Sequence, residues 1–262
     1  MHFKAKKSLG QNFLIDQNII RKIIDTVEIK NKEILEIGPG SGNLTTHILN
    51  KSPKKMYVVE KDNNLSALLS EKFNNKISII NDDILKISED KISKEKLTVF
   101  GNLPYNISTE ILSKWIINLD KEFWFNELVL MFQKEVADRI IAKFNSSSYG
   151  RLSILSNWKL NIQKIIDIKP ESFSPRPKID SSLLIFKPKE NFFKLINADN
   201  LEIITRVFFS QRRKMIKKPF NQIFKNAKEI SNKFGIDLNL RPQNLSPETY
   251  LKIAKEYENL NG

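Results

Sequence analysis

"EILEIGPGSGNLT" (residues 33–45) is the stretch that sets the fold class of this 262-residue chain. An isoleucine-rich apolar run is followed by Gly38, Gly40 and Gly42, and a segment of helical length begins near Asn43. This order predicts a buried strand, a glycine-rich turn and a helix. The G-x-G-x-G spacing lets a backbone pass close to a nucleotide ligand, but it also suits a tight structural turn with no ligand.

Short apolar segments of the same kind recur along the chain, separated by polar segments of helical length. Six more of them are predicted as strands: 55–60, 76–82, 97–102, 126–132, 152–158 and 181–187. Strands that alternate with helical spacers indicate an α/β fold, with a mostly parallel, Rossmann-like sheet and helices on both faces. Ligands of such sheets bind outside the carboxyl ends of the strands, so candidate site residues are sought there.

Helical patterns lie on either side of the strand-rich region. Asp16 can cap a first helix, whose apolar face is formed by Ile19, Ile20, Ile23, Ile24 and Val27. From about residue 190 onward only helical periodicity remains, in the segments 201–218, 220–230 and 245–257. In the last segment Ser246 is a plausible N-cap and Pro247 takes the first helical position. We therefore predict two domains, a Rossmann-like domain over 1–188 and a small all-helical domain over 189–262.

The composition excludes several classes of site. The chain has no cysteine, which excludes disulfides, thiolate metal sites and cysteine nucleophiles. Its two histidines, His2 and His47, are taken as structural, so we expect no histidine-based triad and no metal. The basic N-terminus lacks the apolar core of a signal peptide, and no run reaches the length of a membrane span. We expect a cytoplasmic protein with no membrane partner.

The charge balance is strongly basic. Lys and Arg outnumber Asp and Glu by 43 to 30, which gives a formal net charge of +13. A lysine-rich surface with no partner explains such an excess, and so does a polyanion partner whose phosphates the lysines contact. Charge alone does not decide between these two interpretations.

Two carboxylates follow successive predicted strands beside the glycine turn. Glu60 ends the second strand, 22 residues after Gly38, where a carboxylate can accept hydrogen bonds from both hydroxyls of a ribose. Asp83 follows the third strand and can accept from an adenine amino group. Each acid alone is also typical of a solvated loop. Together they suggest an adenosine moiety, which fits either NAD or S-adenosylmethionine.

The fourth strand end, "GNLPY" (101–105), carries an amide, a proline and an aromatic ring but no acid, base or thiol. The Asn102 side-chain carbonyl and the Leu103 backbone carbonyl can accept both N–H groups of an adenine amine and favour a lone pair that points forward. Pro104 stiffens the turn, and Tyr105 offers a face on which a base can stack. This pattern predicts a clamp for an everted base, although a turn with a buried tyrosine has the same sequence.

A second aromatic residue, Phe173 in "ESFSPRPKIDS" (171–181), can cover the other face of that base. Pro175 and Pro177 would hold this loop rigid and extended. The alternative is a phenylalanine that fills the core beneath a proline-rich loop.

These motifs resemble those of the ribosomal RNA adenine N6,N6-dimethyltransferases, and within them the group that acts on the small subunit. The matching segments run in order over nearly the whole chain: "KSLGQNFL" (7–14), "EIGPGSGNLT" (36–45), "VVEKD" (58–62), "GNLPYNIS" (101–108), "QKEVADRI" (133–140), "YGRLS" (149–153), "FSPRPKIDS" (173–181) and "QRRK" (211–214). The resemblance implies a Rossmann-like methyltransferase domain followed by a small helical domain. It also implies methyl transfer from S-adenosylmethionine to two adjacent adenosines in the 3′-terminal hairpin of small-subunit (16S) rRNA, during ribosome biogenesis.

The predicted base clamp gives the catalytic set, which is Asn102, Leu103, Pro104, Tyr105 and Phe173. The resemblance implies cofactor contacts at Asn12, Leu14, Gly38, Glu60, Asp83 and Asn102, and the glycine turn adds Gly40 to this cofactor set. Asn12 and Leu14 come from the resemblance alone, because the residues themselves suggest only a capped turn before the first helix. Ser41 stands where relatives vary.

A basic cluster lies in the predicted helical domain. "QRRKMIKK" (211–218) packs five cations into eight residues. We expect these side chains to contact rRNA phosphates, although the solvated end of a helix has the same composition. They are Arg212, Arg213, Lys214, Lys217 and Lys218.

Three other functions were weighed. The related large-subunit (23S) rRNA methyltransferases of macrolide resistance commonly carry isoleucine where Leu103 stands here. An NAD-dependent dehydrogenase needs an acid or base near the fourth strand, and "NLPY" offers none. A non-catalytic ribosome-assembly factor would use the charge and leave the pocket vestigial.

We expect the partner to be 16S rRNA within the small subunit or its assembly intermediate, and the protein to be a monomer.

Overall fold

The computed structural model describes residues 10–119 and 122–261, so His2 and the first part of the matched segment 7–14 lie outside the described residues. Contacts divide the chain into two compact units. The sheet unit takes in Met1–Lys114, Leu119–Ala137 and Ile162–Pro188, and the helical unit takes in Trp115–Asn118, Asp138–Asn161 and Lys189–Gly262.

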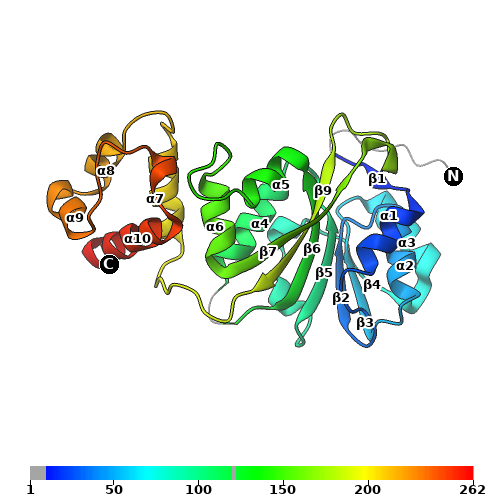
Figure 1. Cartoon of the computed structure of the whole chain (residues 1–262). Helices are drawn as coiled ribbons and strands as arrows, with labels where there is room; N and C mark the ends of the chain where they lie inside the picture. The colour runs from blue at the N-terminus through cyan, green and yellow to red at the C-terminus, as the bar shows by residue number, and fades with distance from the viewer. Residues whose placement is uncertain (1–9, 120–121, 262) are drawn as a thin grey trace. The chain divides into compact units, whose positions relative to one another are not determined.

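The secondary structure of the described residues is shown in Figure 1. The strands are β1 (Phe13–Leu14), β2 (Glu33–Ile37), β3 (Lys55–Val59), β4 (Ser78–Ile80), β5 (Leu97–Asn102), β6 (Phe125–Gln133), β7 (Leu160–Ile168), β8 (Phe173–Ser174) and β9 (Ser181–Pro188). The α-helices are α1 (Gln17–Ile24), α2 (Asn43–Leu49), α3 (Asn63–Phe73), α4 (Ser108–Ile117), α5 (Lys134–Ile140), α6 (Arg151–Lys159), α7 (Asp199–Phe209), α8 (Lys217–Ile223), α9 (Ala227–Lys233) and α10 (Pro247–Asn261). Short 3₁₀ turns are η2 (Asn74–Lys76), η3 (Ile84–Lys86), η4 (Glu89–Lys91), η5 (Pro170–Ser172) and η6 (Pro242–Asn244).

The main sheet has seven strands in the order β4-β3-β2-β5-β6-β9-β7. Strands β4, β3, β2, β5 and β6 are parallel to one another, and β9 pairs antiparallel with β6. The predicted α/β fold with a parallel-dominated sheet is confirmed. The strand order reverses at β2, which pairs with β3 on one side and β5 on the other. This reversal opens a crevice at the carboxyl ends of the strands, where ligands of such sheets bind.

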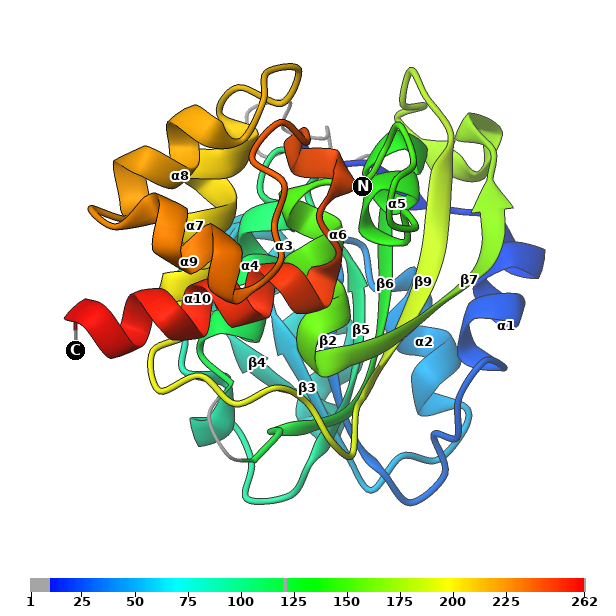
Figure 2. The ribbon, with the colours of Figure 1, turned by 60° about the vertical axis from the view of Figure 1, so that its left-hand side comes forward.

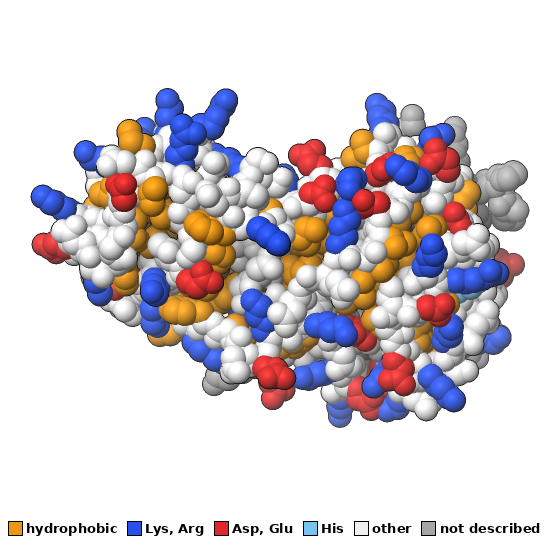
Figure 3. Space-filling model, viewed as in Figure 1, with side chains coloured by type: hydrophobic (Ala, Val, Ile, Leu, Met, Phe, Trp, Pro, Cys, Tyr) orange, Lys and Arg blue, Asp and Glu red, His pale blue; other side chains and the backbone are white. Residues whose placement is uncertain are grey.

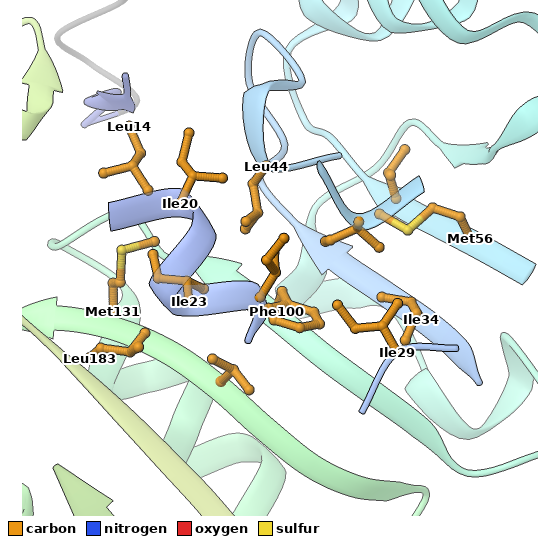
Figure 4. Packing of buried hydrophobic residues seen from close by; sticks show 14 of the residues in the cluster. Leu14, Ile20, Ile23, Ile29, Ile34, Leu44, Met56, Phe100, Met131 and Leu183 are labelled. Atoms are coloured by element: carbon orange, nitrogen blue, oxygen red, sulfur yellow. The ribbon is translucent and has the colours of Figure 1, made fainter. Parts of the chain in front are cut away.

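Helices α1, α2 and α3 cover one face of the sheet, as Figure 1 shows, and α4 lies on the other. The cluster in Figure 4 joins Ile20 and Ile23 of α1 with Ile34, Met56 and neighbouring strand residues. Helix α1 begins where the sequence predicts, because the Asp16 carboxylate accepts from the backbone N–H groups of residues 18 and 19. Burial of the apolar face of α1 packs this helix against the sheet whose strand ends carry the candidate site.

The predicted strand at 152–158 is wrong, because these residues form helix α6. Almost the whole helix is buried, and it packs against α7 and α10, so it has no polar face. A short helix that is buried on nearly all sides has no regular apolar stripe, so periodicity cannot distinguish it from a buried strand. The strand of this region is β7, which begins one residue after α6 ends and was not predicted. The other six predicted strands are present as β2, β3, β4, β5, β6 and β9.

The helical unit is built around α7, which packs against α6, α8 and α10 (Figure 2). Its core contains edge-to-face ring pairs between Phe208 and both Phe220 and Tyr250. Helix α10 begins as the sequence predicts, since Pro247 is its first residue and the Ser246 hydroxyl accepts from the Thr249 N–H.

The helices of this unit are shorter than their periodicity predicts. Segment 201–218 is not one helix, because α7 ends at Phe209 and α8 begins only at Lys217. Between them the Ile216 and Lys217 N–H groups donate to the carbonyls of residues 240 and 238, so tertiary hydrogen bonds replace helical ones. The buried Ile216 holds this turn in place. Segment 220–230 is likewise divided, into the end of α8 and most of α9.

The chain passes from the sheet unit to the helical unit after Pro188, at the predicted boundary, and residues 138–161 also cluster with the helical unit. The division into two domains, 1–188 and 189–262, stays a prediction, since clustering of contacts does not test independent folding. No helix in the two described ranges is both long enough and apolar enough to cross a bilayer.

Candidate active site

A cavity lies at the carboxyl ends of four adjacent parallel strands. The segment before α1 closes it from the side with residues 10–13. The strand ends contribute Gly38 and Gly40 after β2, Glu60 and Lys61 after β3, Asp82 and Asp83 after β4, and residues 102–106 at the end of β5. Nine of the predicted site residues, from separate parts of the sequence, therefore meet at the reversal of strand order: Asn12, Gly38, Gly40, Glu60, Asp83, Asn102, Leu103, Pro104 and Tyr105.

The glycine turn after β2 needs glycine for two different reasons. Gly38 and Gly40 both have positive φ, +65° and +57°, which disfavours other residues. A Cβ on Gly40 would lie 2.6 Å from the ring of Phe13, so this glycine admits an aromatic side chain. A Cβ on Gly38 would meet only the Asn102 carbonyl oxygen, at 3.7 Å, so this glycine leaves its side open to the cavity.

Glu60 is buried at the floor of the cavity, with 6% of its surface exposed. Its Oε2 accepts from the Gly40 N–H at 3.2 Å and its Oε1 from the Asp62 N–H at 2.9 Å. Burial raises the pKa of this carboxyl above its usual value, and the two amides oppose the rise. A carboxylate oxygen accepts more than one hydrogen bond, so both oxygens keep acceptor capacity for a ribose.

Asp83 also lines the cavity, and it caps η3. Its Oδ1 accepts from the Leu85 N–H at 3.1 Å, and its Oδ2 is 2.8 Å from the Lys61 ammonium. The hydrogen bond from Lys61 lowers the pKa of this carboxyl. Beside it Ile84 and Leu85 supply an apolar wall, which suits a flat base whose edge is read by a polar group.

The amide of Asn102 is oriented by a contact across 90 residues of sequence. Its Nδ2 donates to the Asn12 backbone carbonyl at 2.7 Å. Because the nitrogen is used there, the oxygen Oδ1 is the end of the amide available as an acceptor in the cavity. The same contact holds Asn12 at the cavity wall, where the resemblance implied a cofactor contact.

Tyr105 lies on the turn after β5 and lines the cavity together with Leu103 and Pro104. The tyrosine is half-buried, and its hydroxyl is 2.6 Å from the hydroxyl of Ser181. Burial raises the pKa of the phenol above its usual value. The group at the cavity is therefore a neutral ring with a fixed hydroxyl, which suits stacking.

Phe173 and Leu14 do not line the cavity. They face each other in the β1–β8 pair, are 3% and 5% exposed, and belong to the core cluster, in which Figure 4 labels Leu14. The Leu14 carbonyl accepts from Asn43 Nδ2 at 2.8 Å. The position of Phe173 thus agrees with the alternative interpretation, in which this phenylalanine fills the core beneath the proline-rich loop. The stacking role of Phe173 and the cofactor contact of Leu14 stay predictions.

The predicted RNA contacts lie on the turn between α7 and α8 and at the start of α8, not on one continuous helix. Arg213, Lys214, Lys217 and Lys218 are exposed, and Figure 3 shows cationic side chains gathered over this part of the helical unit. Arg212 is half-buried, and its guanidinium donates to Gln243 Oε1 at 3.3 Å and to the Ser147 carbonyl. Arg212 thus holds the turn together, and its contact with phosphate stays a prediction like those of the other four.

Several cavity residues were missed by sequence reasoning. Gln11 and Phe13 line it, and Gln11 Nε2 donates to Asp62 Oδ2 at 3.2 Å. Their positions depend on the pairing of β1 with β8, which joins residues about 160 apart, and no local pattern indicates it. Lys61 follows directly after Glu60, so the rule that ligands bind at strand ends would have identified it.

Two carboxylates of the cavity, those of Glu60 and Asp83, have hydrogen-bond partners within the chain. Glu60 is bound by backbone amides, and Asp83 by Lys61 and an amide. In the described ranges, no three histidine or acidic side chains are grouped in a way that could hold a metal ion.

The family model described as "Ribosomal RNA adenine dimethylase" matches residues 2–259. A protein of Pelagibacter ubique (strain HTCC1062), named "Ribosomal RNA small subunit methyltransferase A", is 72% identical over 262 residues, which is the full length of both chains. A Wolbachia protein (subsp. Drosophila simulans, strain wRi) with the same name is 40% identical over 97% of this chain and 94% of its own.

Solved structures show the same fold. A dimethyladenosine transferase from Plasmodium falciparum superposes with a TM-score of 0.77 at 27% identity, over 94% of this chain and 98% of its own. The 23S rRNA methyltransferase ErmE superposes with a TM-score of 0.68 at 21% identity, over 95% of this chain and 100% of its own. At that identity ErmE shows the fold alone.

Proposed function

We propose that this chain, which belongs to the ribosomal RNA adenine dimethylase family, methylates N6 of two adjacent adenosines in the 3′-terminal hairpin of small-subunit (16S) rRNA. The chain is an rRNA methyltransferase by its family. The position of the adenosines, the methyl donor and the ribosomal context are the proposed part. The product would be N6,N6-dimethyladenosine, formed during biogenesis of the small subunit.

One observation supports the proposal most strongly, the orientation of Asn102. Its Nδ2 is tied to the Asn12 carbonyl, and its Oδ1 is left to accept from an amine in the cavity. A neutral adenine N6 amine does not need to lose a proton before it attacks the methyl carbon, since a proton leaves the nitrogen after the N–C bond has formed, but its lone pair is delocalised into the ring. An uncharged acceptor that holds an N–H therefore assists it more than a titrating group would.

S-adenosylmethionine is proposed as the methyl donor because the cavity residues fit its parts. The open side of Gly38 lets a ligand approach the backbone, and Glu60 keeps acceptor capacity for ribose hydroxyls. Asp83 and the apolar wall at Ile84 and Leu85 suit an adenine ring. When bound, S-adenosylmethionine supplies an electrophilic methyl carbon.

The chain's own contribution is orientation. Asn102 Oδ1 and the Leu103 carbonyl accept from the substrate amine, and the ring of Tyr105 holds the everted base by stacking. Pro104 removes a backbone donor between these groups and stiffens the turn. The rate enhancement then comes from holding the amine and the methyl carbon in line.

The other functions weighed from the sequence gain no support. The relatives at 72% and 40% identity carry small-subunit names, whereas the 23S enzyme ErmE shares only the fold. NAD-dependent redox chemistry does not fit a family of adenine dimethylases. A role in assembly without catalysis is not favoured by the ordered set of Glu60, Asn102 and Tyr105.

The proposed setting follows from the substrate. Small-subunit rRNA is made and assembled in the cytoplasm, so the chain would act there, as a monomer, on the subunit or an assembly intermediate. The basic turn at Arg213 and Lys214 would contribute phosphate contacts.

The test uses purified small and large subunits from cells that lack the enzyme, incubated with S-adenosylmethionine labelled in its methyl group. We expect label in small-subunit RNA and none in large-subunit RNA. Fully methylated small subunits serve as the control and should accept no label. Incorporation into large subunits alone would overturn the proposal.

A further inference from the structure

Ser181 is the first residue of β9 and lies outside the cavity, fully buried. Its Oγ is 2.6 Å from the Tyr105 hydroxyl, a contact between residues 76 apart in sequence. The backbone position of Ser181 is fixed by the sheet, since Ser181 stands opposite Gln133 in the antiparallel β6–β9 pair. The serine hydroxyl is thus a rigid point beside a cavity residue.

Tyr105 itself has no such support from secondary structure. It lies on a turn between β5 and α4, where no ladder of backbone hydrogen bonds sets the direction of its ring. A ring attached to such a turn can swing about its side-chain torsions unless its far end is held. The contact with Ser181 holds that far end, because the phenolic hydroxyl is the atom most distant from the backbone.

We propose that Ser181 is a positioning residue for methyl transfer, which fixes the Tyr105 ring in the plane on which the target base stacks. The inference rests on the proposed function, because it assigns Tyr105 the stacking role. Ser181 does not touch the substrate, and it acts only through the tyrosine hydroxyl. Loss of its hydroxyl leaves the cavity lining unchanged and gives the ring a wider range of orientations.

The next residue along β9 provides a matched control. Ser182 is equally buried, and its Oγ donates to Asp167 Oδ1 at 2.6 Å. Successive side chains of a strand point to opposite faces, so Ser182 faces away from Tyr105. The two serines therefore share strand, burial, side chain and hydrogen-bond length, and they differ in which residue they hold.

The experiment compares Ser181→Ala with Ser182→Ala in methylation of small subunits, with cofactor affinity measured separately by calorimetry. We expect Ser181→Ala to lower kcat roughly tenfold, because a small misplacement of a reacting group is costly. The Kd for S-adenosylmethionine should stay within about twofold of wild type, because only the substrate side is loosened. Ser182→Ala should keep the wild-type kcat.

Tyr105→Phe removes the same hydrogen bond from the other side and keeps the ring, so it should lower kcat as Ser181→Ala does. The double variant should be no slower than either single one, since the second change removes nothing further. Tyr105→Phe therefore tests the positioning role of Ser181 even if the Ser181→Ala variant does not fold.

The outcomes separate the inference from the proposed function. If the wild-type protein does not methylate small subunits, the proposed function fails. If the wild type is active but Ser181→Ala and Tyr105→Phe keep its kcat, or if Ser182→Ala loses as much as Ser181→Ala, the positioning role is wrong.

Discussion

Asn102 has an amide whose two ends are used differently. The nitrogen joins β5 to the segment before α1 through the Asn12 carbonyl, and the oxygen is left for the substrate. A carboxylate in its place would have no donor for that carbonyl, and a hydrophobic residue would lose both contacts. The amide is therefore suited to this position as neither an acid nor an apolar side chain would be.

Asn102→Ala should lower the rate of methyl transfer by about two orders of magnitude, the loss typical when a hydrogen bond that orients a reacting group is removed. The affinity for S-adenosylmethionine should fall much less, because Gly38, Glu60 and Asp83 remain. Single-turnover kinetics with saturating cofactor measure the first quantity, and calorimetry measures the second. A variant that methylates at the wild-type rate would show that the amide does not hold the amine.

Glu60 should make cofactor binding sensitive to mild acid. Burial raises the pKa of its carboxyl, so it takes up a proton at a higher pH than an ordinary glutamate does. A protonated carboxyl is a weaker acceptor for ribose hydroxyls, so affinity should fall as the pH falls through this raised value. Calorimetric titrations from neutral to mildly acidic pH measure the effect.

Two variants assign this pH dependence. Glu60→Gln should weaken binding and flatten the dependence. Asp83→Asn should weaken binding but keep the dependence, because Lys61 lowers the pKa of Asp83 and holds it charged across the range. An unchanged dependence in Glu60→Gln would refute the assignment.

At the scale of elements, β2 carries a buried acid behind the glycine turn. Glu36 is 2% exposed and accepts from the Thr45 hydroxyl of α2 at 2.6 Å. Burial raises the pKa of this carboxyl from 4.5 to about 7. The folded protein thus binds the proton more tightly than the unfolded chain, and folding stability falls as pH rises from about 4.5 to 7.

Glu36→Gln should remove this fall of folding stability with rising pH, because glutamine keeps an acceptor for the Thr45 hydroxyl and does not ionise. The free energy of unfolding of the variant, relative to wild type, should increase between pH 5 and pH 8 by a few kcal/mol, at about 1.4 kcal/mol per pKa unit. Urea unfolding at a series of pH values measures the difference. A difference that is constant with pH would show that Glu36 has an ordinary pKa.

Helix α4 holds the wall of the cavity that carries Asp83. The Lys114 ammonium donates to the carbonyls of Ile84 and Ile87 and to Glu89 Oε1, at 3.1, 2.5 and 2.8 Å. All three donors of the ammonium are thus used on one loop. The loop has only short 3₁₀ turns of its own, so this clamp fixes its position.

Lys114→Met should therefore lower the affinity for S-adenosylmethionine. Loss of the contacts that hold the loop should reduce the binding free energy by about one to two kcal/mol, which corresponds to a roughly tenfold weaker affinity. The matched control is Lys233→Met, which removes an ion pair with Glu256 in the helical unit. Calorimetry on both variants gives the comparison, and equal affinities would show that the clamp does not act on the site.

Most strands could be predicted, because each is a short run rich in β-branched residues that is followed by a turn. Glu60, Asp83 and Asn102 could be predicted as site residues, because they lie at or after the ends of such runs. Helix α6 could not, since its burial on all sides removes the periodicity that marks a helix. The turn at residues 210–216 depends on hydrogen bonds to residues 238 and 240, which no local pattern contains. Phe13 and Phe173 depend on the β1–β8 pair, and their sequence alone fits a core position and a site position equally well.

At the scale of the whole molecule, a net charge of +13 favours association with a polyanion but does not locate the contact. The turn between α7 and α8 is one candidate, because Arg213, Lys214, Lys217 and Lys218 are exposed there. Arg212 should be kept in a charge-reversal variant, because its contacts with Ser147 and Gln243 hold the turn in place.

Charge reversal of Arg213 and Lys214 to Glu should weaken binding of the small subunit and lower the slope of log affinity against log salt by ~2, about one per lost phosphate contact. Affinity for S-adenosylmethionine should not change. Reversal of Lys228 and Lys252, two other exposed lysines of the helical unit, makes the same change in net charge and should have less effect. Filter binding across a range of salt concentrations distinguishes a local contact from general attraction, and equal slopes for both pairs would exclude the local contact.

Nucleotide-resolution mass spectrometry of small-subunit RNA, after reaction with the wild-type protein and with Asn102→Ala, decides whether the cavity methylates adenine N6. We expect the wild type to produce N6,N6-dimethyladenosine at two adjacent positions near the 3′ end, and Asn102→Ala to leave both nearly unmodified in the same time. Methyl groups on another base or atom, or full dimethylation by the variant, would contradict this function and the role of the amide in it.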